Sequence, residues 1–287
     1  MDHFPIAIVT DSTCDIPQPL ADKYQIKIVY HTIIFGNKEF KDRLEMSSEG
    51  FYRKLDEGGP IPTTAQASIQ DFYEVFQALK NQGAKEILVF VVSSALSGSH
   101  QSATNAAGMV DIPVHIIDSK GTTMSLGWQV LTAARVREKG GNLEQMINDS
   151  AKVRKSLVLI VGMNTVEYLF HGGRIGLAKK LIGSALQIKP VVMINHENGI
   201  VEPDGSARTY RNMVEMVYRR FGEKIIRQGK LHIAVLHGGA VSEAENLAER
   251  IRKDFNPFEL FINLTTPVLG VNTGPKAVAI CGYSEEE

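Results

Sequence analysis

The residues of this chain that could hold an anion gather in a serine-rich turn, SSALSGSHQSA, at positions 93–103. The turn follows the apolar run 87–92, whose branched side chains predict a buried strand. A helix that starts near Ser97, Gly98 and Ser99 aims unpaired backbone N–H groups and the positive end of its dipole at an oxyanion. We therefore expect an anion at this turn. A serine N-cap beside a turn glycine is the plain structural alternative.

A second candidate is the arginine in EYLFHGGRIG, residues 167–176. The glycines let the backbone of this turn approach a ligand, and the planar guanidinium of Arg174 suits a two-pronged pair with a carboxylate or phosphate. The segment lacks the G-x-x-x-x-G-K-[ST] pattern of a Walker phosphate loop. A glycine C-cap whose arginine pairs with a local acid would explain the same residues.

Two weaker candidates are polar residues in loops. Thr64 lies in the loop 58–68, which glycine and proline punctuate, and its hydroxyl could serve an anion. Asn272 and Thr273 are expected in a turn, NTGPK, before a final strand at 277–281. Such residues either point into a site or shape their loops.

Known catalytic and metal-binding patterns are missing from the sequence. It contains no G-x-S-x-G, H-E-x-x-H or G-x-G-x-x-G segment. Its two cysteines, Cys14 and Cys281, are far apart and match no zinc spacing. We therefore predict no catalytic residue, no metal and no cofactor. The hydroxyl-bearing loops, the arginine and the aliphatic second half favour binding of an anion with an apolar body.

Buried strands alternate with helices in the first half of the chain. Strands are predicted at 6–9, 87–92 and 114–117, and polar segments follow them. This order is typical of a parallel sheet wrapped by helices, whose ligands collect at the carboxyl ends of the strands. A new series of strands and helices begins near residue 160, and we place the domain boundary there. The predicted fold class is α/β with two domains, an N-terminal parallel-sheet domain at 1–160 and a C-terminal mixed α/β domain at 161–287.

The second half is predicted to hold an apolar helix at 178–186, a hairpin at 189–203 and a long amphipathic helix at 207–229. The long helix carries five arginines, which are Arg208, Arg211, Arg219, Arg220 and Arg227. A basic helix face is usually solvated surface, and contact with a partner or a membrane surface is the alternative.

Charge and composition exclude some classes of function. In 287 residues, 31 Lys and Arg stand against 32 Asp and Glu, so no basic domain suggests nucleic-acid binding. The opening residues, MDHFPIAIVTD, lack the pattern of a signal peptide, and no apolar run reaches the length that spans a bilayer. We expect a soluble, cytoplasmic protein.

Taken together, six segments resemble the successive motifs of the DegV family. They are VTDSTCDIP (9–17), PTTAQAS (62–68), SSALSGSHQSA (93–103), DSKGTTMSLG (118–127), YLFHGGRI (168–175) and GVNTGPKAV (270–278). The resemblance implies a two-domain α/β carrier that binds one long-chain fatty acid, as the FakB proteins do. It places the carboxylate between the domains and the acyl chain in a tunnel of the second. It also implies that a separate FakA-type fatty-acid kinase converts the bound acid to an acyl-phosphate for phospholipid synthesis.

The motifs carry the family's site residues onto numbered positions of this chain. The threonine of the P-x-T segment falls on Thr64, and the head-group serine of the L-S-G turn falls on Ser97, next to Gly98. The arginine of the G-G-R-I motif falls on Arg174. The basic residue that the family uses towards its kinase falls on Arg208.

The C-terminal motif departs from the family pattern. The family usually has H-T-G-P-G, with the histidine near the carboxylate, where this chain has Asn272 and Lys276. Asparagine can donate a hydrogen bond to a carboxylate but carries no charge. Lys276 would supply a fixed charge if its side chain turned inward. Ala65 and Ala67 also stand where the family often has serine and proline.

Two other functions stay open at the level of sequence. One is a small-molecule phosphotransferase or hydrolase that uses Ser97 and Arg174, with Asp118 or His100 as the base. The other is a peripheral lipid-transfer or regulatory module whose arginine-rich helix makes transient contact with membranes or a partner.

Overall fold

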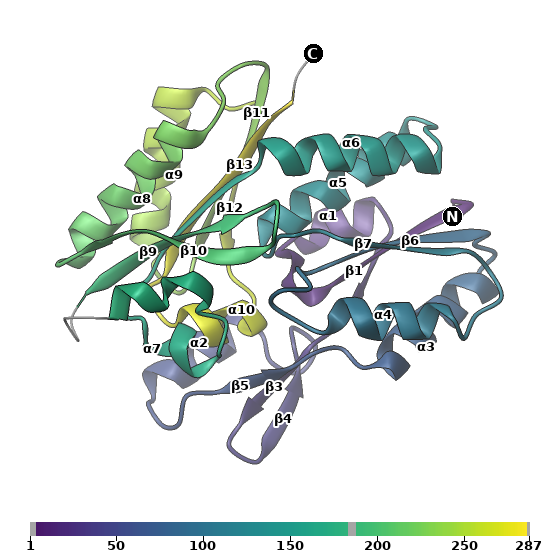
Figure 1. Cartoon of the computed structure of the whole chain (residues 1–287), viewed down its shortest axis with the longest axis horizontal. Helices are drawn as coiled ribbons and strands as arrows, with labels where there is room; N and C mark the ends of the chain where they lie inside the picture. Colours follow the sequence, from purple (N-terminus) through teal and green to yellow (C-terminus); the bar gives the residue numbers. More distant parts are fainter. Residues whose placement is uncertain (1–3, 183–187, 286–287) are drawn as a thin grey trace.

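The computed structural model describes residues 4–182 and 188–285 of the chain, in which helices pack on two sheets (Figure 1). The first sheet is all parallel, in the order β2-β1-β6-β7. Its strands are β1 (Ile6–Asp11), β2 (Ile26–Val29), β6 (Glu86–Val91) and β7 (Val114–Asp118). The helices of this half are α1 (Gln18–Lys23), α2 (Ser48–Asp56), α3 (Ile69–Asn81), α4 (Ser99–Ala107), α5 (Met124–Glu138) and α6 (Leu143–Ser156).

Helices cover both faces of the parallel sheet because its strands are apolar on both sides. In β1, Val9 packs in the core with Phe72 and Phe76 of α3, whereas its neighbour Ile8 packs in the core that contains Trp128 of α5. Successive strand residues point to opposite faces, so one continuous apolar run supplies both cores. The predicted α/β class and the predicted parallel sheet wrapped by helices are confirmed.

A small antiparallel sheet interrupts this half, in the order β4-β3-β5. Its strands are β3 (Thr32–Phe35), β4 (Lys38–Lys41) and β5 (Thr63–Ala65). Its first strand, β3, follows β2 closely in the chain but belongs to a different sheet. The loop expected at 58–68 contains β5, a strand of three residues that is too short to show a periodic pattern.

The second sheet is mixed and has six strands, in the order β10-β9-β8-β13-β11-β12. Its strands are β8 (Val158–Gly162), β9 (Lys189–Asn195), β10 (Ile200–Ala207), β11 (Lys230–His237), β12 (Glu259–Leu264) and β13 (Val278–Glu285). The helices α8 (Tyr210–Lys224) and α9 (Val241–Phe255) pack with β11 and β13 in a second core. The expected hairpin is confirmed as β9 and β10. A domain boundary at 160 falls inside β8 and stays a prediction.

One helix, α5, joins the two sheets through a shared core. Its Trp128 is fully buried, and the indole stacks on the Phe261 ring of β12 with centroids 5.2 Å apart. Arg135 of the same helix forms a forked pair with Glu259, at 2.8 and 2.9 Å. Deleting a buried aromatic side chain of this kind costs about 3–5 kcal/mol. The two halves of the chain are therefore fixed against each other by packing around α5.

The apolar helix predicted at 178–186 is a 3₁₀ helix at Gly176–Ile182 in the described residues, and 183–186 lie outside the described part. One local prediction is wrong. Asn272 and Thr273 were expected in a turn, but they end a short helix, α10 (Pro267–Thr273). Proline at its first turn starts this helix, and Gly274 ends it at a φ of +71°. The helix α7 (Glu167–His171) precedes the arginine turn.

Within residues 4–182 and 188–285, no helix combines the length and the apolar character needed to cross a bilayer.

Candidate functional site

A cavity lies between the carboxyl end of the parallel sheet and the face of the second sheet that packs towards α5. Its polar lining residues are Thr13, His31, Thr64, Gln66, Ser97, Thr122, Arg174, Asn272 and Thr273. Its apolar lining residues are Val92, Leu96, Leu159, Val161, Met163, Leu169, Val192, Ile194, Val201, Val268 and Leu269. Both halves of the chain contribute to it.

The apolar wall comes from alternate positions of three neighbouring strands. Leu159 and Val161 lie on β8, Val192 and Ile194 on β9, and Val201 on β10. Residues i and i+2 of a strand point to the same face, so these side chains form one continuous aliphatic surface. A surface of this kind favours a hydrocarbon over a hydrated ligand.

The tip of the β9–β10 hairpin is attached to the end of β6. Ser93 donates a hydrogen bond from Oγ to the carbonyl oxygen of Gly199, at 3.0 Å. Gly199 has a φ of +75°, and a Cβ there would lie 1.9 Å from the Ser93 oxygen. Only glycine fits this position, because it meets both the backbone conformation and the close approach. The apolar wall is thus held next to the serine turn.

The serine turn itself leads from β6 into α4, as the sequence predicts. The Ser97 Oγ accepts a hydrogen bond from the backbone N–H of Ser99 at 3.2 Å, and lies 2.9 Å from the Ser99 hydroxyl. A Cβ on Gly98 would lie 2.2 Å from Oε1 of Gln66, so the Gln66 side chain packs directly on the turn. Gly98 therefore shapes the wall of the cavity without lining it.

Sequence reasoning missed one titratable residue of the cavity, His31. Its side chain is 3% exposed, and its Nε2 lies 3.0 Å from the Ser99 hydroxyl. Burial lowers the pKa of this histidine. The Asp11 carboxylate opposes that shift, and the cations Lys41 and Arg174, each with a smaller effect than Asp11, add to it. The only feature of the sequence that could have indicated His31 is its position inside an otherwise apolar segment.

Arg174 crosses from the second half of the chain to the first. Its Nε donates to the carbonyl oxygen of Leu96 at 3.1 Å, and its Nη1 donates to that of Gly172 at 2.6 Å. Among the described residues, no carboxylate lies within 4.0 Å of this guanidinium, so the local acid pair that the sequence allowed is not formed. Nη2 makes no hydrogen bond to a described residue.

Two further predicted residues line the same cavity. Thr64 lies on β5, opposite Ile33 of β3. Asn272 donates from Nδ2 to the carbonyl oxygen of Val268 at 3.2 Å, and its buried Oδ1 has no partner among the described residues. A Cβ on Gly172 would lie 2.2 Å from that oxygen, so Asn272 packs against the arginine turn. The cavity therefore brings Thr64, Ser97, Arg174 and Asn272 together.

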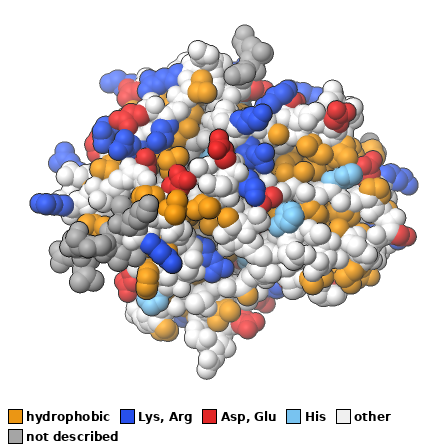
Figure 2. Space-filling model, in the orientation of Figure 1, with side chains coloured by type: hydrophobic (Ala, Val, Ile, Leu, Met, Phe, Trp, Pro, Cys, Tyr) orange, Lys and Arg blue, Asp and Glu red, His pale blue; other side chains and the backbone are white. Residues whose placement is uncertain are grey.

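Lys276 and Arg208 lie elsewhere. Lys276 is exposed and does not line the cavity, so it supplies no inward charge. Arg208 is exposed in the connection between β10 and α8. Over α8 and α9, basic and acidic side chains alternate on the surface shown in Figure 2. Arg219 and Arg220 both pair with Glu223, so the expected basic face is partly neutralised.

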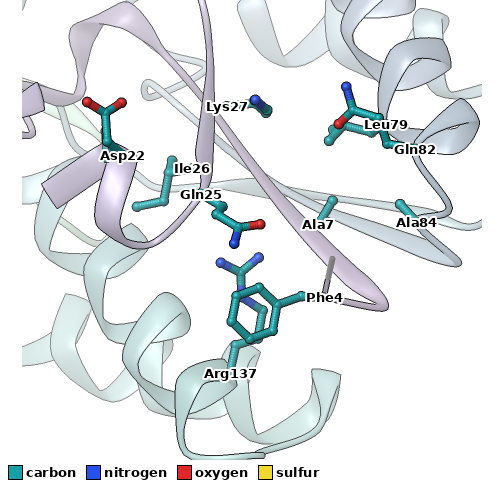
Figure 3. A pocket seen from close by; sticks show the side chains of 11 residues that line it. Phe4, Ala7, Asp22, Gln25, Ile26, Lys27, Leu79, Gln82, Ala84 and Arg137 are labelled. Carbon is teal, nitrogen blue, oxygen red and sulfur yellow. The ribbon is translucent and has the colours of Figure 1, made fainter. Parts of the chain in front are cut away.

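A second hollow lies at the opposite, amino end of the parallel strands (Figure 3). Arg137 points into it, under the ring of Phe4, but its Nη1 donates to the carbonyl oxygen of Ile6 at 3.0 Å and its Nη2 donates to that of Tyr24. The guanidinium therefore caps the strand ends, and none of the predicted site residues lies there.

Comparison with known proteins points to one family. A family model described as an uncharacterised protein of the DegV family matches residues 5–285. A DegV domain-containing protein from Clostridium acetobutylicum is 34% identical over 287 residues, which cover 98% of each chain. Another from Halalkalibacterium halodurans is 30% identical over 282 residues, covering 98% of this chain and 99% of that protein.

Solved structures give the same result. The structure of a DegV family protein from Thermus thermophilus, described by its fatty acid binding, has a TM-score of 0.90 and 28% identity and covers 98% of this chain and 99% of that one. DegV from Bacillus subtilis, described as a fatty acid binding protein, has a TM-score of 0.89 and 26% identity with the same coverage. The chain belongs to the DegV family.

Proposed function

We propose that this protein binds one long-chain fatty acid in the cytoplasm, with the carboxylate between the two halves and the acyl chain in the second half, 161–287. The observation that carries this proposal is a single cavity in which Ser97 and Arg174 meet the aliphatic wall of β8, β9 and β10. The fatty acid binding of the Thermus thermophilus and Bacillus subtilis relatives supports it.

The polar end of the cavity suits a carboxylate. Ser97, Thr64 and Asn272 offer uncharged donors, and Arg174 offers the free Nη2 of a guanidinium that is already fixed at two other atoms. Hydrogen bonds to a charged group are stronger than those between neutral groups, and burying a carboxylate without them costs free energy. The acyl chain adds about 0.8 kcal/mol for each buried methylene, so most of the affinity comes from the tail.

Native mass spectrometry of the protein as purified from bacteria tests this proposal. We expect one fatty acid per chain, which denaturation releases for identification. An empty protein that also fails to take up added fatty acids would contradict the proposal.

As a carrier, the protein would present its bound acid to a FakA-type fatty-acid kinase. We assign the kinase contact to Arg208, which is exposed and stands apart from the cavity. With such a kinase and ATP, Arg208→Glu should abolish acyl-phosphate formation while fatty-acid affinity stays unchanged. Arg219→Glu, on the helix α8 that follows Arg208 but already paired with Glu223, is the matched control.

Loading and release would take place by transient contact with a membrane surface. Phe170 and Leu177 are 58% and 47% exposed, on either side of the arginine turn. Exposed apolar side chains of this kind suit an interface with lipid. Transfer of fatty acid from anionic vesicles should slow in the double variant Phe170→Ser/Leu177→Ser, and an unchanged rate would rule out this route.

The alternative function, an enzyme that uses Ser97, has less support. The Asp118 carboxylate is held by the Lys120 ammonium at 2.7 Å, and neither Asp118 nor His100 lines the cavity. His31 reaches Ser97 only through the Ser99 hydroxyl. Turnover of phosphate esters or acyl esters by the purified protein, lost in Ser97→Ala, would favour the enzyme.

A further inference from the structure

Three side chains in a row run from the buried His31 to Ser97. The His31 Nε2 lies 3.0 Å from the Ser99 Oγ, and that oxygen lies 2.9 Å from the Ser97 Oγ. Ser97 lines the cavity, whereas Ser99 is fully buried behind it. The residues come from segments far apart in the sequence, and His31 is the single imidazole among the lining residues.

Each hydroxyl has one hydrogen. The Ser99 hydroxyl is fully buried between the other two groups, so its hydrogen goes either to His31 or to Ser97, and the row has two arrangements. In the inward arrangement, Ser97 donates to Ser99 and Ser99 donates to the His31 Nε2. Ser97 then has no hydrogen left for a ligand. In the outward arrangement, the His31 Nε2–H donates to Ser99 and Ser99 donates to Ser97. Only the outward arrangement leaves the Ser97 hydrogen free to face the cavity.

A carboxylate selects the outward arrangement, because an ionised carboxylate can only accept hydrogen bonds. The backbone N–H of Ser99 already donates to the Ser97 Oγ at 3.2 Å, so this oxygen is saturated as an acceptor when Ser99 also donates to it. Hydrogen bonds in such a chain polarise one another and strengthen the terminal donor. The nitrogen of the imidazole that carries the proton therefore decides how well the Ser97 hydroxyl can donate a hydrogen bond to an anion.

The structure assigns to His31 a positioning role in the carboxylate site: its Nε2–H, acting through Ser99, turns the Ser97 hydrogen towards the bound acid. This inference rests on the proposed fatty-acid function.

Without a ligand, the groups around the His31 imidazole permit either tautomer. On the other side of the ring, the Ser12 Oγ accepts from the His31 backbone N–H at 3.1 Å and lies 3.4 Å from the ring Nδ1. The ionisable groups that act on the imidazole are Asp11 of β1, Lys41 of β4, Asp71 of α3 and Arg174 of the arginine turn. Because these charges have both signs, they do not select one tautomer. The ligand itself therefore decides which arrangement forms.

Nitrogen-15 NMR of the imidazole ring, with and without hexadecanoic acid, observes the arrangement directly. We expect the His31 Nε2 to carry a proton in the complex. An unprotonated Nε2 in the complex would overturn the inference. The experiment needs a wild-type protein that binds the acid, so failure to bind at all contradicts the proposed function instead.

Affinity measurements with two ligands of equal chain length separate positioning from a structural role. The alcohol head group of 1-hexadecanol donates as well as accepts, so it fits either arrangement. His31→Leu should weaken binding of hexadecanoic acid about three- to tenfold and leave 1-hexadecanol within about twofold. His31→Gln, which keeps an N–H donor, should restore acid binding. Equal losses for both ligands, or no rescue by His31→Gln, would show that the residue is only structural.

A double variant tests whether His31 acts through Ser99. In a Ser99→Ala background, the further change His31→Leu should leave acid affinity as it is, because the row is already broken. A second loss of the same size as in the wild-type background would contradict the relay.

Discussion

The Nε of Arg174 donates a hydrogen bond to the carbonyl oxygen of Leu96, at 3.1 Å. This contact joins the arginine turn, in the second half of the chain, to the residue before Ser97 in the first half. The contact therefore places Ser97 and Arg174, the two main candidates from the sequence, at one cavity. A ligand held by both residues would also hold the two halves of the chain together.

Loss of either head-group donor should weaken fatty-acid binding. Ser97→Ala and Arg174→Ala each remove a hydrogen bond to a charged group, which is worth about 1.5–3 kcal/mol, or roughly 10- to 150-fold in affinity. Titration calorimetry with a long-chain fatty acid measures the change. Arg53→Ala, an exposed arginine outside the cavity, is the control. Wild-type affinity in both site variants would show that the head-group assignment is wrong.

Gly98→Ala should change the site more than it changes stability. The φ of Gly98 is −79°, which any residue adopts, but the new Cβ would displace the end of the Gln66 side chain. We expect the melting temperature to stay close to that of the wild type and fatty-acid affinity to fall several-fold. In a Gln66→Ala background the same change should have no effect on affinity, because the obstacle is gone. An undiminished loss in that background would place the cause elsewhere.

A larger side chain in the apolar wall should shift the preferred chain length. Val161 lines the cavity from β8, whereas Val158, on the same strand, packs on the opposite face in the second core. Overpacking by a phenylalanine costs about 1–3 kcal/mol at either position. Only Val161→Phe should favour shorter fatty acids in a competition measured by mass spectrometry. The same shift in Val158→Phe would mean that the wall is not where the acyl chain lies.

The buried Asp42 carboxyl group should make a contribution to stability that falls with rising pH. Burial raises the pKa of Asp42 to about 7, and its Oδ2 has no partner among the described residues. In the unfolded chain an aspartate has a pKa of about 3.9. Between these values the folded state keeps a proton that the unfolded state has lost. The contribution of Asp42 to the free energy of unfolding therefore decreases as pH rises from about 4 to about 7, by about 4 kcal/mol at 1.36 kcal/mol for each pH unit.

Urea unfolding at pH 5 and at pH 8 measures this dependence. Asp42→Asn should lose much less stability than the wild type between the two values, because the amide does not titrate. Asp56→Asn, at an exposed position, should follow the wild-type profile. An identical pH dependence in the Asp42 variant and the wild type would mean that Asp42 is already ionised in the fold.

Local signals in the sequence were sufficient for the buried strands at 6–9, 87–92 and 114–117 and for the helix after the serine turn. Ser68 and Asp71 form the capping box that their spacing indicates, and α3 begins directly after Ser68. The pattern failed where elements are short. The strand β5 has three residues and α10 has seven, so neither spans enough periods to be distinguished from a loop.

The sequence by itself determined the α/β class, the serine turn after β6 and the glycine turn around Arg174, because each depends on residues adjacent in the chain. Only the tertiary structure decided what faces those residues. Ser99 and His31 are 68 positions apart, and the aliphatic wall comes from three strands of another sheet. Such contacts follow from how α5 and the two sheets pack, and no local pattern encodes them. The donors of the proposed carboxylate site can therefore be predicted from the sequence, whereas the His31 imidazole behind them cannot.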